Sequence, residues 1–211
     1  MSALANKLGA INLGQGFPDT DGPEEIKQAA IRAINDGRGN QYPPAHGVPE
    51  LRKAIAAHQK RFYNLDIDWE SQVVVGTGAA EIIQSALIAL VDSGDEVLIF
   101  EPWFDIYQVA VDMARGKSVG IPLSGTTMRP DFDYLRKAIT ERSKVIVLNS
   151  PHNPSGIVFT RDELQELADI AIEHDLIVIS DEAYEHLWYD GHPHIPCHHQ
   201  HAAQIQQPAQ H

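Results

Sequence analysis

Three polar side chains occur where a folded chain often binds a ligand. Asn153 follows a β-branched run and lies in the segment Asn149–Gly156, while Asp181 and Tyr184 follow the next such run. The carboxyl ends of strands are where open α/β sheets bind ligands. An asparagine there can donate to an oxygen anion, a carboxylate can be buried and functional, and a tyrosine three residues later can reach the same pocket. The two segments therefore predict one polar pocket at one edge of a sheet.

Each segment also has a plain structural interpretation. An isolated Asn-Pro-x-Gly pattern is as typical of a simple turn between a strand and a helix as of a binding loop. A carboxylate at the end of a strand can serve only to cap the next helix. Either segment alone is a weak signal, and their convergence on one sheet edge is what favours a site.

A third segment, Gly76–Glu81, has the composition of a phosphate-binding loop. Small residues leave backbone N–H groups accessible, and a helix N-terminus favours an anion. The segment half-matches the dinucleotide pattern G-x-G-x-x-G, but Glu81 replaces the third glycine. An acidic side chain beside a pyrophosphate is unfavourable, so the segment favours a single phosphate.

Short apolar runs alternate with amphipathic stretches from residue 71 to 180. This pattern predicts an α/β fold, a mostly parallel sheet flanked by helices with right-handed crossovers. A helix that opens at Thr160 carries Glu163 three residues on, a capping-box pattern. The expected strands are 73–75, 97–100, 119–123, 145–148 and 176–179, and the other expected helices are 79–91, 103–114 and 132–140.

The remaining regions suggest three parts of the chain. Residues 1–70 hold a Gly/Pro-rich start and helices over 24–36 and 49–63. Residues 71–191 hold the alternating strands and helices. Residues 192–211 contain six of the eleven histidines and no Asp, Glu, Lys or Arg, and we expect this Gln-rich tail to be disordered. Its cluster Cys197, His198, His199 and His201 lacks a carboxylate or a regular second pair, so no metal site is predicted.

Composition excludes several classes of protein. Sixteen basic residues against 29 acidic ones give a net charge of −13, which argues against sequence-independent binding to nucleic acid or anionic membranes. No run approaches the length of a membrane-spanning helix. The start resembles no signal peptide, and the single cysteine allows no intrachain disulfide, so a cytoplasmic location is expected.

Six segments in order resemble the class I pyridoxal-phosphate (PLP) aminotransferases of fold type I. The similarity covers about residues 10–191 and is strongest to the branch with kynurenine, methionine and succinyldiaminopimelate aminotransferases. It implies transfer of an amino group between an amino acid and a 2-oxo acid through PLP, in a homodimer with shared sites. It also implies that residues 1–70 form part of the active-site rim and that residues 71–191 form a partial PLP-binding large domain. The segments are 12–19, 40–43, 76–81, 101–105, 151–156 and 180–186.

The resemblance implies a role for each residue around the cofactor ring. Asp181 would pair with the protonated pyridine nitrogen, and Tyr184 and Asn153 would hydrogen-bond the phenolic oxygen. Phe104 would stack on the ring. By composition alone Phe104 would simply pack in a core, and its position within the motif reverses that interpretation.

The resemblance also implies contacts to the phosphate and the substrate. Backbone amides of Ala79 and Ala80 would hold the phosphate at the helix N-terminus. Gly16 and Asn153 would lie beside the substrate carboxylate. Tyr42 would reach the phosphate of the partner subunit, although it too could be an ordinary packing residue.

The resemblance implies one further residue that this sequence lacks. A lysine that holds the cofactor covalently should follow the segment around Tyr184, but no lysine follows Lys144 and no arginine follows Arg161. We therefore expect a truncated form, incomplete in its large domain and inactive, with no catalytic residue of its own. The alternatives are a non-catalytic cofactor-binding remnant and a PLP carbon–sulfur lyase of the same fold. An NAD-binding module is disfavoured by Glu81 and by the two polar loops.

Overall fold

The structure is a computed structural model that describes residues 2–13, 16, 18 and 20–197. The chain divides into two compact units, the first ending at Pro44 and the second beginning at Ala45. The helix expected over 49–63 is observed as α3 (Pro49–Tyr63) and belongs to the second unit. The three-part division with boundaries at residues 70 and 191 stays a prediction.

The first unit is helical where it has regular structure. It contains α1 (Ser2–Leu8), α2 (Glu24–Asn35) and the 3-10 turn η1 (Arg38–Asn40). The sequence predicted α2 but not α1. Glu24 and Glu25 occupy the first turn of α2, where carboxylates interact favourably with the helix dipole.

The second unit is built on a five-stranded sheet with the order β3-β2-β1-β4-β5. All neighbouring strands are parallel except β3, which pairs antiparallel with β2. The predicted α/β class is confirmed, and only the short β3 was not anticipated. The strands are β1 (Glu96–Glu101), β2 (Lys117–Ser124), β3 (Arg129–Pro130), β4 (Ser143–Asn149) and β5 (Ile177–Asp181).

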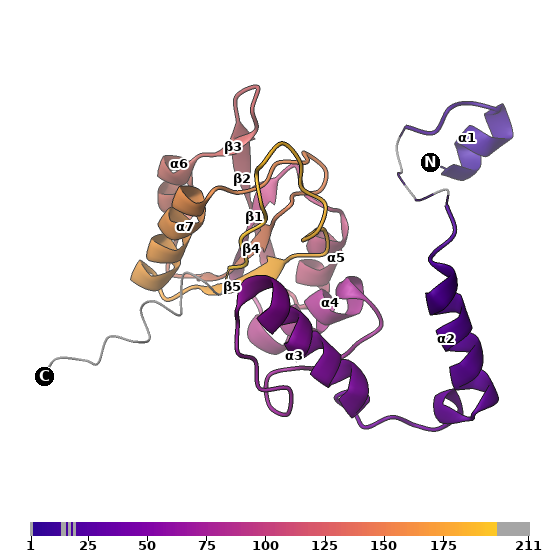
Figure 1. Cartoon of the computed structure of the whole chain (residues 1–211). Coiled ribbons are helices and arrows are strands. Elements are labelled where there is room, and N and C mark those ends of the chain that lie inside the picture. The colour runs from indigo at the N-terminus through magenta and orange to yellow at the C-terminus, as the bar shows by residue number, and fades with distance from the viewer. Residues whose placement is uncertain (1, 14–15, 17, 19, 198–211) are drawn as a thin grey trace, which may run out of the picture. The chain divides into compact units, whose positions relative to one another are not determined.

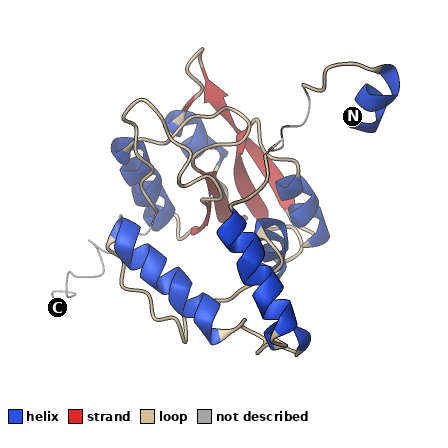
Figure 2. Ribbon diagram, turned by 45° about the vertical axis from the view of Figure 1, so that its right-hand side comes forward, coloured by secondary structure: helices blue, strands red, loops and turns tan. Residues whose placement is uncertain are grey.

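Helices cover both faces of this sheet (Figures 1 and 2). Successive strand residues point to opposite faces, so each strand contributes to two cores. Val97 and Ile99 pack with α4 (Ala79–Leu90) and α5 (Ile106–Met113). Leu98 and Phe100 pack on the other face with α6 (Phe132–Ala138) and α7 (Arg161–Glu173). This three-layer arrangement explains why the central strands read as continuous apolar runs.

The strand order reverses next to β1. The chain passes from β1 to β2 on one side, whereas β4 lies on the other side of β1. Such a switch point opens a crevice at the carboxyl ends of the strands, where doubly wound sheets bind ligands. The loops after β1, β4 and β5 all begin at that edge.

The predicted capping box of α7 is present. Thr160 Oγ1 accepts from the Glu163 amide at 3.3 Å, and Glu163 Oε2 accepts from the Thr160 amide at 2.8 Å. Glu163 also pairs with Arg129 from β3, whose Nε donates to Oε1 at 2.7 Å. The cap therefore also connects α7 to the edge strand.

The prediction of a strand over residues 73–75 is wrong. Val73 is buried as expected, but Val74 is 59% exposed and the segment joins no ladder among the described residues. Its backbone pairs elsewhere, because Arg52 Nε donates to the Val73 carbonyl at 2.9 Å and the Val75 amide donates to the His46 carbonyl at 3.0 Å. An arginine side chain thus takes the place of a neighbouring strand.

The prediction that the whole tail is disordered is also wrong for residues 192–197. His194 is 7% exposed, and Ile195 and Cys197 pack against the core that includes Phe159. The Cys197 amide donates to Glu182 Oε1 at 3.1 Å. A few apolar contacts and one charged acceptor order this stretch despite its polar composition. Residues 198–211 lie outside the described part of the chain.

Glu96 allows a test of the sheet's stability against pH. Its side chain is 7% exposed and accepts from Lys117 Nζ at 2.9 Å and from Thr140 Oγ1 at 2.7 Å. Those hydrogen bonds lower the pKa of Glu96 below 4.5 despite the opposing effect of burial. Because the pKa is lower in the folded state, the ionised carboxylate stabilises the fold above the unfolded-state pKa. This contribution disappears as pH falls through the folded-state value.

We expect Glu96→Gln to lower the free energy of unfolding by about 1–2 kcal/mol at pH 7. The difference from the parent protein should shrink as the pH falls below 4.5. Urea unfolding at several pH values measures both, with the exposed Glu141→Gln as control. A difference that is constant with pH, or one that grows in acid, would contradict the assignment.

Candidate active site

The loops after β4 and β5 are joined at the carboxyl edge of the sheet. Asn149 and Asp181 are partners in the last step of the ladder between these strands. The Ser150 amide continues the connection by donating to the Asp181 carbonyl at 3.2 Å. Both polar segments identified in the sequence therefore begin next to each other, at the paired ends of β4 and β5.

Asn149 is the residue that holds the two loops together. It is 3% exposed, and its Nδ2 donates to the Asp181 carbonyl at 2.9 Å. Its Oδ1 accepts from the Asn153 amide at 2.6 Å. The sequence interpretation gave Asn149 no role, although its position as the last residue of a strand, four before Asn153, was a usable signal.

Asp181 is buried and held in a fixed orientation. It is 9% exposed, its Oδ1 accepts from the Ala183 amide at 3.1 Å, and its Oδ2 accepts from Tyr107 Oη at 2.6 Å. Tyr107 is 1% exposed, and burial together with the Asp181 carboxylate raises the pKa of its phenol well above the ordinary value. Tyr107 therefore stays a neutral donor. It was missed in the sequence, where it lies one helical turn after Phe104.

Asn153 and Tyr184 meet across the two loops. Asn153 Nδ2 lies 3.5 Å from Tyr184 Oη, and Tyr184 remains 39% exposed. Both line a cavity of about 360 Å³ together with His152 and Leu187. Two groups that could bind the same ligand oxygen thus point into one space.

The buried side chain of His152 stabilises the loop that follows β4. It is 4% exposed, and its Nδ1 lies 2.8 Å from Ser155 Oγ. Burial lowers the pKa of His152, so the ring is neutral at physiological pH. The His152 amide donates to the Ile157 carbonyl at 2.8 Å, which closes the loop on itself.

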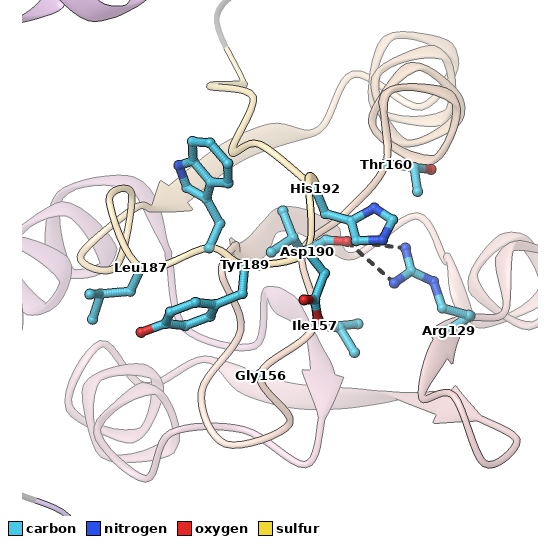
Figure 3. Close-up of a pocket in the computed structure, with 10 residues that line it drawn as sticks. Arg129, Gly156, Ile157, Thr160, Leu187, Tyr189, Asp190 and His192 are labelled. Carbon is cyan, nitrogen blue, oxygen red and sulfur yellow. Dashed lines mark hydrogen bonds between the residues drawn. The ribbon is translucent and has the colours of Figure 1, made fainter.

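A second cavity of about 340 Å³ lies beside the first and shares Gly156, Leu187 and Tyr189 with it. Figure 3 shows Arg129 and His192 on its other side, with Arg129 donating to the Val158 carbonyl at 3.2 and 3.3 Å. Its lining lacks Asn153 and Tyr184. The cavity that contains Asn153 and Tyr184 is therefore the better candidate for chemistry.

Phe104 follows β1 at the same edge. Its ring meets that of Tyr107 edge to face, with 5.9 Å between the ring centres, and it is 40% exposed. Tyr107 thus connects the exposed ring of Phe104 to the buried carboxylate of Asp181. An aromatic face near a fixed carboxylate suits a planar, cationic ligand ring.

The phosphate-loop candidate lies at the start of α4. Gly78 has φ +85°, a conformation that favours glycine, and a Cβ on Gly76 would approach Ile82 Cδ1 to 2.6 Å. The helix begins at Ala79 with no side-chain cap, so the first amides of Ala79 and Ala80 are oriented for an anion. Glu81 Oε2 accepts from the Thr77 amide. This hydrogen bond orients the Glu81 carboxylate toward the loop.

Two of the predicted residues belong to the first unit. Gly16 has open space where a Cβ would stand, and Tyr42 is fully exposed. Their proposed contacts to substrate and partner subunit stay predictions. Within the Cys/His cluster considered from the sequence, only Cys197 is described, and burial raises the pKa of its thiol to about 11.

Comparison with known proteins assigns the family. The family model for aminotransferase class I and II matches residues 9–206, and the chain belongs to that family. It is 48% identical over 198 residues to a probable N-succinyldiaminopimelate aminotransferase of Mycobacterium tuberculosis, covering 93% of this chain and 50% of the relative. It is 39% identical over 200 residues to the methionine aminotransferase of Escherichia coli, covering 94% and 52%.

The solved structures agree with the sequence relatives. The N-succinyldiaminopimelate aminotransferase structure from Mycobacterium tuberculosis matches with a TM-score of 0.90 at 48% identity, over 93% of this chain and 52% of that one. The chain spans about half the length of the curated relatives it matches. None of the helices among the described residues is long and apolar enough to cross a membrane.

Proposed function

We propose that this chain binds PLP at the carboxyl edge of its sheet and serves amino-group transfer between an amino acid and a 2-oxo acid. The observation that carries the proposal is the buried Asp181 carboxylate, fixed by Tyr107 at 2.6 Å beside the Asn153–Tyr184 pair. Membership of the aminotransferase family supports the reaction type. The relatives named above differ in substrate, so only the substrate class is proposed.

The donors and acceptors present fit the chemical groups of PLP. A pyridinium nitrogen needs a buried carboxylate, and Asp181 provides one with two of its acceptor positions already used for orientation. A phenolic oxygen needs neutral donors, which the Asn153 amide and the Tyr184 hydroxyl can supply. A phosphate needs free backbone amides at a helix start, and α4 offers those of Ala79 and Ala80.

PLP, when bound, supplies an electron sink for the negative charge that forms at the α-carbon of the amino acid. Asp181 would hold the proton on the pyridine nitrogen, and Tyr107 would keep that carboxylate in place. Asn153 and Tyr184 would orient the ring through its phenolic oxygen. Phe104 would cover one face of the ring and exclude water from it.

The same proposal includes contacts beyond the second unit. Gly16 and Asn153 would lie beside the substrate carboxylate, and Tyr42 would reach the phosphate site of a partner subunit in a homodimer. These assignments rest on the family resemblance. No residue of the 211 is proposed as the proton-transferring base, since no lysine follows Lys144.

A PLP titration of the purified chain tests the proposal. We expect a saturable change in visible absorbance at one equivalent, and no specific pyridoxyl-lysine adduct in the intact mass after borohydride reduction. Titration with a nicotinamide dinucleotide is the control and should show no binding. Binding of the dinucleotide in place of PLP, or a stoichiometric lysine adduct, would contradict this proposal.

A further inference from the structure

A cluster of possible metal ligands lies outside the proposed cofactor site. His58 comes from α3, whereas Glu185 and His186 follow β5 directly after Tyr184. One ligand atom from each lies within 4.8 Å of the other two. The three residues are far apart in sequence, so the fold itself brings them together.

The distances within the cluster are close to those between ligand atoms that share one ion. The two Nε2 atoms of His58 and His186 are 3.0 Å apart, and Glu185 Oε1 lies 3.7 Å from the first and 3.9 Å from the second. Ligand atoms about 2.0–2.1 Å from a tetrahedral zinc ion stand about 3.3 Å from one another. Small movements of the side chains would therefore centre an ion among all three.

The surroundings restrict these side chains but leave part of their hydrogen-bonding capacity unused. The Phe62 ring packs against both imidazoles, with centroids 4.6 Å from His58 and 4.9 Å from His186. Glu185 Oε2 is buried without a hydrogen-bond partner among the described residues. The Nε2–Nε2 contact can hold only one proton between two nitrogens, whereas a cation would satisfy both nitrogens and the carboxylate at once.

We propose that His58, Glu185 and His186 form a zinc site. Two imidazoles and one carboxylate are a ligand set that zinc accepts, with a fourth position left for water. His186 is 53% exposed, so that position faces solvent. The ion connects α3 to the segment that carries Tyr184, and so stabilises one wall of the proposed cofactor pocket.

Clustered histidines can bind zinc weakly without forming a defined site, so the test begins by replacing the three closely spaced histidines at positions 198, 199 and 201. A variant with His198→Gln, His199→Gln and His201→Gln serves as the parent, freed of metal with a chelator. Isothermal titration with Zn²⁺ alone should show one ion per chain. Zinc should also raise the melting temperature, since it binds only the folded site.

In that parent, His58→Gln should weaken zinc binding at least roughly 100-fold, because even changes in the outer shell of a metal site cost 10–100-fold. Glu185→Gln provides a second test in case the first variant folds poorly, which melting without metal reveals. The matched control is His174→Gln, an exposed histidine at the end of α7, which should bind zinc like the parent. The proposal would be overturned if the parent did not bind zinc, or if the His58 and Glu185 variants bound zinc as tightly as the parent does.

Discussion

Replacement of Asp181 by alanine is expected to weaken PLP binding roughly 150- to 5000-fold, since losing one partner of a buried ion pair costs about 3–5 kcal/mol. Asp181 is the carboxylate placed to pair with the pyridine nitrogen, and it is 9% exposed. Without it, a protonated ring would be buried without a counter-charge. Titration of both proteins by visible absorbance measures the effect.

Two further variants separate charge from packing at this position. Asp181→Asn preserves the shape and should weaken binding in the same direction, because the amide cannot neutralise the pyridinium. Tyr107→Phe removes only the hydroxyl that donates at 2.6 Å and should cost roughly tenfold, about 1.4 kcal/mol. Equal PLP affinity in Asp181→Ala and the parent protein would show that the ring binds elsewhere.

Replacement of Asn149 by alanine is expected to lower the free energy of unfolding by about 1–3 kcal/mol and to weaken PLP binding as well. The change removes the acceptor of the Asn153 amide and one of the two donors to the Asp181 carbonyl. Both loops then lose their common anchor, although no contact with the cofactor is removed. Urea unfolding and PLP titration measure the two effects.

Asn153→Ala is the matched control for Asn149. It keeps the backbone amide and removes only the side chain that lies 3.5 Å from Tyr184 Oη. We expect weaker PLP binding with a stability change within about 0.5 kcal/mol. If Asn149→Ala were as stable as this control, the anchoring role would be wrong.

The central sheet could be predicted because its signal is local. Runs such as Val145–Leu148 are apolar on both faces, and the capping box at Thr160 marks a helix start by residue type alone. The strand over 73–75 failed because its run of valines carries no information about partners. Its hydrogen bonds go to Arg52 and to the His46 carbonyl, which only the tertiary fold supplies.

Some residues of the site could likewise be predicted from the sequence, and others could not. Asp181, Asn153 and Tyr184 stand out because each occupies a loop at the end of a strand, and their common edge follows from a parallel sheet. Tyr107 and Asn149 did not stand out, since a buried tyrosine in a helix and an asparagine ending a strand are ordinary in sequence. Their importance comes from hydrogen bonds to residues 74 and 32 positions away.

The tail shows the limit of composition. Residues 192–197 lack Asp, Glu, Lys and Arg and were grouped with the histidine-rich end. The structure nevertheless buries His194 and packs Ile195 on the core, because Glu182 offers a charged acceptor to the Cys197 amide. Average polarity over a segment cannot reveal one such contact.

A crystal structure of the chain with PLP tests the proposed pocket most directly. We predict that the pyridine nitrogen lies within hydrogen-bond distance of Asp181 and that the phosphate meets the amides of Ala79 and Ala80. The phenolic oxygen should be bound by Asn153 and Tyr184. PLP found at another surface, with Asp181 still paired only to Tyr107 and Ala183, would contradict the proposed site.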